Sequence, residues 1–368
     1  MEALVIGGTG PTGPHILSGL LDRDFDVTLL HRGVHEPPGL PEVPHLHADP
    51  HFPETLAEAT HGRSFDVVLA MYGRVRAIAD VFDGRCGQLV AVGGVPVYRG
   101  CVDPQDTRPY GMRLLAREDG PLADSAQPVP KFSELILKAE RAALDPARRY
   151  RSAAVRYTGI YGPRNVLPWE WTVVKRVLDG RRQMIIPDEG LGIISRCAAR
   201  NAAEVVLRIV DHPEVADRQA YNVADDDQFT YRQWAERVID LLGAEMELVS
   251  IPSELAPSAL AELPPPGARP HLLVDNNKAK HELGYQQVVA AEDALAEAVR
   301  WLVDNPVTAE QYPMYAGKFD YEMEDRLIAA YRGACDWVRE QVSDEAPELS
   351  HPMPHPVAPT LTVDERGR

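Results

Sequence analysis

The sequence predicts an α/β protein with a Rossmann-type doubly wound parallel sheet, a smaller C-terminal substrate lobe and a helical C-terminal extension. Three observations predict it. A short apolar run leads through a glycine-rich turn into a segment with helical apolar spacing. Short apolar segments then alternate with helical ones, which is typical of βαβ units. The 368 residues, of which 45% are hydrophobic, suffice for one large domain with appendages or for two domains.

The first of these features lies in residues 1–21. Residues 3–6 form the apolar run, and His15 to Leu21 carries the helical spacing. In such a strand, turn and helix the missing Cβ atoms let the backbone approach a pyrophosphate, and the unpaired N–H groups of the helix start favour an anion. We therefore predict a dinucleotide site on the turn. Its expected cofactor-binding residues are Gly7, Thr9, Gly10, Pro11, Thr12 and Gly13.

Further strands follow in the order that a doubly wound sheet requires. They are predicted at residues 26–30, 43–47, 65–71 and 88–92, with helical stretches between several of them. The last part of the chain, from Tyr321 to Val342, has helical apolar spacing and should pack on another surface. We predict a nucleotide-binding domain over 1–166, a lobe interleaved with the last core strands over 167–306, and an extension with a Pro-rich tail over 307–368.

Composition excludes several classes of function. Thirty-eight basic residues against 55 acidic ones give a net charge of −17, which would repel nucleic acid and anionic lipid. No apolar run approaches 18 residues, and acidic Glu2 precedes the first apolar run where a signal peptide would carry basic residues. We expect a cytoplasmic protein without nucleic-acid or membrane partners. The expected partner is a small-molecule substrate. A homodimer with a second copy of the chain is left open by the sequence.

Cysteine and histidine usage predicts no metal site. The cysteines are scattered without a Cys-x-x-Cys pair, which suits a reducing compartment and supplies no zinc framework. His45 and His47 share a face of the third predicted strand and His51 follows closely, but we interpret them as incidental histidines at the sheet edge. The cysteines, expected as small core or surface residues, are Cys86, Cys101, Cys197 and Cys335.

Several separate motifs together carry a family resemblance. The turn has the spacing Gly-x-x-Gly-x-x-Gly, and Asp49 follows the third strand. The later motifs are Arg156 to Pro163, Gln219 to Ala224, and Asp275-x-x-Lys278 followed by Leu283-Gly284-Tyr285. With them, residues 1–306 resemble the extended short-chain dehydrogenase/reductases of the NAD(P)-dependent epimerase/dehydratase branch. The resemblance implies a nicotinamide cofactor, with Asp49 on its adenine side and Met71 also in contact with it.

The end of the second strand favours NADP(H) over NAD(H). NAD enzymes place an acidic residue there for the ribose 2′-hydroxyl, whereas a 2′-phosphate needs cationic donors. This chain has His31 and Arg32 and no acid. We therefore expect both residues at the cofactor, while a solvated surface arginine remains the alternative for Arg32.

The residues that the resemblance implies for catalysis are missing. The family uses a Ser or Thr after the fifth strand, a Tyr as acid or base, and a Lys four residues later that lowers the pKa of the Tyr. In this sequence Gly93 and Gly94 stand at the serine positions, Phe132 at the Tyr and Ile136 at the Lys. Neither Phe132 nor Ile136 can ionise. The catalytic residues are therefore unknown.

Three residues remain as weak catalytic candidates, and a tryptophan-containing loop as a substrate site. Lys138 would require a two-residue slip, which rotates side chains by about 200° on a helix. Lys131 is better explained as a surface lysine at the start of a helix, and Tyr110 as a packing tyrosine in the preceding loop. After Tyr161, two tryptophans in a Pro-bounded loop could form an apolar cradle or belong to a domain interface. The expected substrate-binding residues, which favour a hydrophobic or aromatic small molecule, are Gly94, Phe132, Tyr161, Trp169 and Trp171.

Three functions fit these features. The first is an atypical NADP(H)-dependent oxidoreductase that transfers a hydride without the Ser-Tyr-Lys triad, acting on a carbon that is already polarised. The second is a non-redox lyase or isomerase that retains the cofactor. The third is a catalytically silent NADP(H)-sensing protein, which the lost triad favours and the large lobe opposes. The sequence favours the first and leaves the substrate, reaction direction and proton donor open.

Overall fold

The computed structural model describes residues 1–34, 39–125, 128–263, 271–310, 312, 315 and 318–344. The chain divides into two compact units, Met1–Glu324 and Asp325–Arg368. Helix α11 (Tyr321–Gln341) makes up most of the described part of the second unit and matches the helix predicted there. The Pro-rich tail with His351 and His355 lies outside the described residues. Among the described helices, none is long and apolar enough to cross a membrane.

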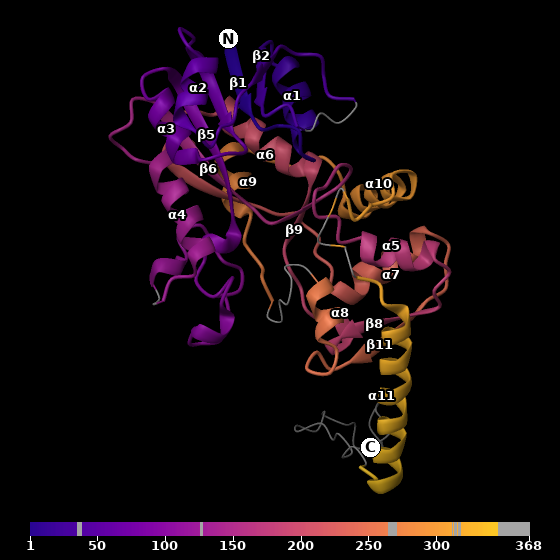
Figure 1. Cartoon of the computed structure of the whole chain (residues 1–368). Helices are drawn as coiled ribbons and strands as arrows, with labels where there is room; N and C mark the ends of the chain where they lie inside the picture. The colour runs from indigo at the N-terminus through magenta and orange to yellow at the C-terminus, as the bar shows by residue number, and fades with distance from the viewer. Residues whose placement is uncertain are drawn as a thin grey trace, which may run out of the picture. The chain divides into compact units, whose positions relative to one another are not determined.

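A seven-stranded sheet with the order β10-β6-β5-β4-β1-β2-β3 forms the centre of the first unit (Figure 1). Every neighbouring pair is parallel, which confirms the predicted fold class. The strands are β1 (Glu2–Ile6), β2 (Asp26–His31), β3 (His45–His47), β4 (Phe65–Ala70), β5 (Cys86–Gly94), β6 (Arg151–Tyr157) and β10 (Gln219–Val223).

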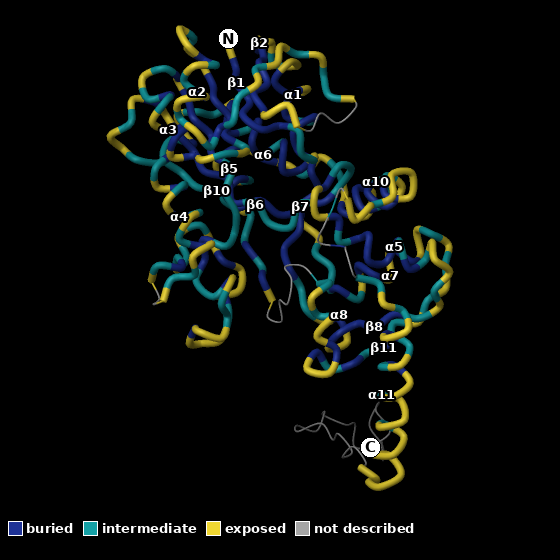
Figure 2. Tube along the Cα trace, in the orientation of Figure 1, coloured by how far each residue is buried: buried dark blue, intermediate teal, exposed yellow. Residues whose placement is uncertain are grey.

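Continuous apolar runs in these strands explain why both faces of the sheet are buried. Residues 3–6 of β1 are fully buried, and Ile6 is in register with Leu30 on one side and Ala70 on the other. Strands covered on both faces read as unbroken apolar segments rather than as alternating ones. Figure 2 shows the strands as buried, with exposed residues on the surrounding helices.

Helices cover the two faces of this sheet. On one face, α1 (Gly13–Leu21) and α6 (Ala199–Asp211) share a core with the strands; Gly19 of α1 faces Leu207 of α6, and an added Cβ at Gly19 would lie 2.2 Å from the Leu207 side chain. On the other face lie α2 (Pro53–Ala59), α3 (Val75–Phe82) and α4 (Lys131–Ala143). Helix α9 (Asn277–Leu283) returns to the first face.

The lobe has a separate core of helices and short strands. Its helices pack around Trp171 and Trp234, and α7 begins with a capping box in which Thr230 and Gln233 satisfy each other's backbone N–H groups. The lobe elements are α5 (Trp171–Leu178), α7 (Tyr231–Leu241), α8 (Pro257–Glu262), α10 (Ala291–Asp304), the pair β8 (Gln183–Pro187) and β11 (Glu247–Ile251), and the pair β7 (Gly159–Tyr161) and β9 (Arg196–Ala198).

A buried ion pair fixes α4 against the end of the sheet. Arg156 on β6 donates to both carboxylate oxygens of Glu140 on α4, at 2.9 and 2.7 Å, and to the Tyr98 hydroxyl at 2.8 Å. Arg156 and Glu140 are 4% and 9% exposed. Because a buried charge that loses its partner is very costly, this pair holds α4 in one register beside β5 and β6.

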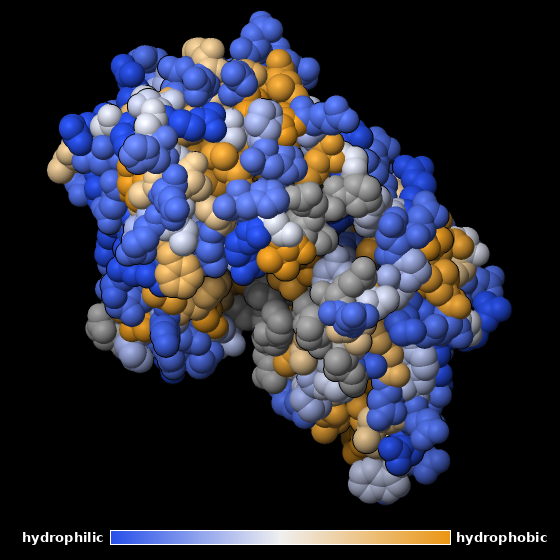
Figure 3. Space-filling view, turned by 45° about the horizontal axis from the view of Figure 1, so that its top comes forward, coloured by the Kyte–Doolittle hydropathy of each residue, from blue (hydrophilic) through white to orange (hydrophobic). Residues whose placement is uncertain are grey.

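Polar residues cover most of the molecular face in Figure 3, with hydrophobic residues gathered in separate patches. Three of the cysteines are buried and Cys335 is partly exposed, in agreement with the expectation of small core or surface residues. All four are free thiols. Strand β3 is shorter than predicted and β5 longer, since β5 continues through Gly93 and Gly94.

Candidate active site

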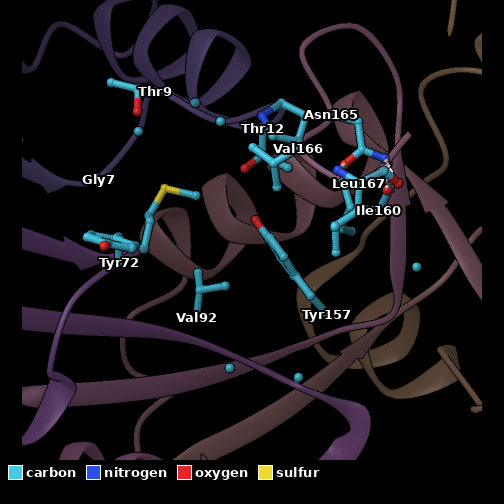
Figure 4. A pocket seen from close by; sticks show the side chains of 18 of the residues that line it. Gly7, Thr9, Thr12, Tyr72, Val92, Tyr157, Ile160, Asn165, Val166 and Leu167 are labelled. Carbon is cyan, nitrogen blue, oxygen red and sulfur yellow. Dashed lines mark hydrogen bonds between the residues drawn. The ribbon is translucent and has the colours of Figure 1, made fainter. Parts of the chain in front are cut away.

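A cavity of about 610 Å³ lies at the carboxyl ends of β1, β4, β5 and β6 (Figure 4). In parallel sheets of this kind, ligands bind at that edge. The lining joins the glycine turn to apolar residues of α4 and of the segment after β7. The lining includes most of the expected cofactor residues and is formed by Gly7, Thr9, Gly10, Pro11, Thr12, Gly13, His31, Arg32, Met71, Tyr72, Gly93, Gly94, Phe132, Ile136, Tyr157, Thr158, Asn165, Val166, Leu167 and Trp169, among others.

The glycine turn has the geometry of a cradle for a diphosphate. Gly7 has a φ of 101°, and a Cβ on Gly13 would lie 1.8 Å from the Gly8 carbonyl oxygen, so the turn closes tightly only without side chains. At Gly10, by contrast, an added Cβ would meet no atom of the described residues within 4 Å. The space over Gly10 is therefore open to the cavity, and the residues present fit a dinucleotide.

The start of α1 adds an electrostatic contribution to this cradle. The helix begins at Gly13 and Thr12 is its cap residue, but no side chain accepts a hydrogen bond from the first turn. The Gly13 N–H donates to the Gly10 carbonyl at 3.1 Å and Pro14 has no N–H, so the helix dipole is what favours an anion at this point.

The end of β2 forms the adenine side of the cavity. Arg32 lines the cavity, and its guanidinium carbon lies 5.3 Å from the centre of the Tyr72 ring. Asp49, which the resemblance placed at the adenine, is not among the lining residues. It instead accepts hydrogen bonds from the backbone and the ring of His51, at 3.0 and 2.8 Å. These bonds lower the pKa of Asp49.

Three histidines lie close together at the end of β2. They are His31, His45 and His47, whereas the sequence had grouped His45 and His47 with His51. Ligand atoms of His31, His45 and His47 lie within 4.8 Å of one another. The Nδ1 of His31 accepts a hydrogen bond from the Gly33 N–H at 3.1 Å, so its Nε2 carries the proton and donates to the Nδ1 of His45 at 3.1 Å. A metal on that Nε2 would displace this hydrogen bond and would require the opposite tautomer.

The other half of the cavity is apolar where the resemblance implied the catalytic groups. An added Cβ on Gly93 would lie 3.5 Å from Ile136 Cγ2, so α4 presents Ile136 to the glycines of β5. Phe132, one turn earlier, also lines the cavity and is 58% exposed. Lys138 points away and pairs with Glu134 at 2.5 Å on the surface. The described lining contains no lysine, aspartate or glutamate.

Two polar side chains of this half, Thr158 and Asn165, are hydrogen-bonded to the backbone of the protein. Thr158 donates to the Val223 carbonyl at 2.7 Å. Asn165 donates to the carbonyls of Ile160 and Leu167 and accepts from the Leu167 N–H, as Figure 4 shows. This part of the lining therefore presents mainly carbon atoms to a ligand.

Tyr157, at the end of β6, is the ionisable group of this half that sequence reasoning missed. Its side chain reaches toward Thr12, and its buried hydroxyl faces that residue without meeting the geometry of a hydrogen bond (Figure 4). Burial raises the pKa of Tyr157, with a partial opposing effect from Thr12. The phenol stays protonated at neutral pH. Its position directly after Arg156, in a motif already singled out, was the signal that could have found it.

The remaining predicted site residues lie elsewhere. Tyr161 is buried and donates to the Asp225 carboxylate at 2.7 Å, and Trp171 packs in the lobe core, so neither lines the cavity, whereas Trp169 does. Lys131 is exposed at the start of α4 and Tyr110 lies in a different pocket. None of the three catalytic candidates reaches the cavity.

Several solved structures have an architecture similar to that of this chain. A dTDP-glucose 4,6-dehydratase from Bacillus anthracis in complex with NAD matches with a TM-score of 0.63 and 17% identity, over 85% of this chain and 99% of that one. A UDP-glucose 4-epimerase from Bifidobacterium longum in complex with NAD⁺ and UDP matches with a TM-score of 0.63 and 16% identity, over 83% and 99%. A Thermotoga maritima UDP-glucose 4-epimerase with UDP-glucose matches equally well, at 0.63 and 16% over 83% and 99%.

This chain has the fold of those epimerases and dehydratases. The fold expected from the resemblance is therefore confirmed. No protein-family profile and no curated protein sequence matches the chain. The shared architecture extends beyond the sheet into the lobe, since nearly the whole length of each matched structure is covered.

Proposed function

We propose that the chain is an oxidoreductase that binds NADP(H) and transfers a hydride to or from an apolar small molecule without a Ser-Tyr-Lys triad. The observation that carries the proposal is the single cavity that joins an open glycine cradle to an apolar end containing Phe132, Ile136 and Trp169. Two of the structures with this fold hold NAD or NAD⁺, which supports a nicotinamide dinucleotide in the same place.

The preference for the phosphorylated cofactor rests on the residues at the end of β2. Arg32 lies in the cavity lining above Tyr72, and the lining residues that the structure describes include no carboxylate to accept bonds from a ribose 2′-hydroxyl. A guanidinium can pair with a phosphate in two parallel hydrogen bonds. NADP(H) therefore suits this end better than NAD(H).

The chain's own residues would orient the reactants rather than move protons. A bound nicotinamide supplies or accepts the hydride. Gly93 and Gly94 leave room beside β5, while Phe132 and Ile136 pack against the reacting groups and exclude water. With no lysine or carboxylate in the described lining, the substrate must bring its own polarisation, as a conjugated enone or an iminium does. Hydride addition to an enone would leave an enolate, which would take its proton from water at the open side of the cavity. An iminium would become a neutral amine and would need no proton.

A catalytically silent NADP(H)-binding protein is the second candidate. The observation that favours it is the same absence of lysine, aspartate and glutamate from the described lining.

The two candidates are separated by following NADPH absorbance across a panel of apolar enones, imines and aldehydes. An oxidoreductase consumes NADPH with at least one member, and Gly10→Val, which blocks the cradle, abolishes that consumption. Binding of NADPH without turnover of any member would assign the chain to the silent class.

A further inference from the structure

A second pocket lies outside the cavity described above, in the segment between β5 and α4, whose loops extend below α4 in Figure 1. Its volume is about 790 Å³, and its lining shares no residue with the first cavity. We propose that it binds an organic anion with an apolar body, meaning a phosphate or carboxylate carried on an aliphatic or aromatic group.

The charge of this pocket is opposite to that of the chain. Four arginines and a single carboxylate, Asp119, line it, although the whole chain has a net charge of −17. Concentrated positive charge in a concave surface attracts anions. The four arginines are Arg99, Arg108, Arg113 and Arg117.

Two of these guanidiniums are available to a ligand. Arg117 lies 3.6 Å from Asp119, and Arg108 donates to the carbonyls of Gln105 and Thr107 at 3.0 and 2.7 Å. Within the described part of the chain, the side chains of Arg99 and Arg113 have no hydrogen-bond or ion-pair partner. Guanidiniums suit phosphate and carboxylate oxygens, with which they form two parallel bonds.

Apolar residues form the rest of the wall. Tyr110, Leu114 and Leu115 line the pocket and are 55%, 48% and 59% exposed. Leu115 also has a φ of 35°, a backbone conformation that costs a non-glycine residue free energy. Two adjacent leucines held toward solvent in this way provide a surface for the apolar part of a ligand.

The loop that carries these residues is fastened at several points, so the pocket is preformed. Ala116 exchanges backbone hydrogen bonds with the strand-like segment around Val274: its N–H donates to the Leu273 carbonyl at 2.9 Å, and its carbonyl accepts from the Asp275 N–H at 2.9 Å. Thr107 is buried, and its hydroxyl accepts from the Gly111 N–H at 2.8 Å. A preformed pocket loses little conformational entropy when it binds a ligand.

Calorimetric titration of the full chain with four probes tests the proposal. Octyl phosphate and octanoate carry both features, inorganic phosphate carries only the charge, and octanol only the apolar body. We expect at least one of the two amphiphilic anions to bind at least about tenfold more tightly than inorganic phosphate and than octanol, and to weaken as salt is added. Which of the two binds better distinguishes a phosphate ligand from a carboxylate.

Single substitutions then locate the binding. Arg99→Ala and Arg113→Ala should each weaken the better anion by about tenfold, the loss expected for a hydrogen bond to a charged group. Arg76→Ala, in an exposed residue of α3 outside both pockets, is the matched control and should have no effect. All three variants should bind NADPH as the wild type does, which separates this site from the first cavity. Equal affinity in the arginine variants and the control, or no binding of either amphiphilic anion, overturns the proposal.

Discussion

Substitution of Gly10 by valine separates cofactor binding from folding. The backbone at Gly10 is not in the left-handed region, and an added Cβ meets nothing within 4 Å in the part of the chain that the structure describes. The free energy of unfolding should therefore change by less than about 1 kcal/mol. The same side chain occupies the space through which a diphosphate must approach the turn. Loss of that approach should raise the Kd for NADPH by more than about 100-fold, which corresponds to ~2.8 kcal/mol.

Thermal unfolding and calorimetric titration of the same preparations measure both quantities. Gly10→Ala is a graded control that should weaken binding less than valine does. Gly13→Ala is the opposite control, because its Cβ would lie 1.8 Å from the Gly8 carbonyl oxygen and should destabilise the fold itself. A Gly10→Val protein that is folded and binds NADPH with the affinity of the wild type would refute the assignment of the turn to a dinucleotide.

Four further substitutions test the cofactor preference, the buried ion pair and the register of α4. Arg32→Ala should weaken NADPH at least about tenfold while NADH, the control ligand, loses little; equal losses measured by calorimetry would remove Arg32 from the phosphate. Glu140→Ala leaves the Arg156 charge buried without its partner and should lower the free energy of unfolding by about 3–5 kcal/mol, measured by denaturant titration. A loss below about 1 kcal/mol would mean that the pair is not buried. Phe132→Ala should raise KM through lost packing. Lys138→Ala should leave kcat and KM unchanged, because Lys138 pairs with Glu134 on the surface. Complete loss of turnover in Lys138→Ala would show that Lys138 is a catalytic lysine after all.

Local signals in the sequence were sufficient for the sheet and for the phosphate turn. β1, β2, β4 and β5 each contain a short apolar run, and the turn combines glycines with the start of a helix, so these elements and their order follow from nearby residues. The register of α4 was also predictable, since Pro130 precedes the helix and Glu140 lies within it; the structure places Ile136 beside Gly93 in the lining.

Residues whose position depends on packing between distant segments could not be placed from the sequence. Trp169 and Trp171 stand two positions apart, but α5 begins at Trp171 and rotates it into the lobe core while Trp169 faces the cavity. Tyr161 was expected at the substrate, yet its hydroxyl binds Asp225, which comes from a segment more than sixty residues later. Tyr157 was passed over because only the three-dimensional arrangement brings it to Thr12.

Transfer of deuterium tests the proposed hydride transfer most directly. NADPH that is deuterated at the reactive carbon of the nicotinamide is incubated with the protein and the panel of apolar enones, imines and aldehydes, and the products are analysed by mass spectrometry. The account predicts that at least one compound gains a single deuterium in the presence of the wild-type protein and none in the presence of Gly10→Val. Tight binding of the labelled cofactor without incorporation of deuterium into any compound, from either face of the nicotinamide, would contradict it.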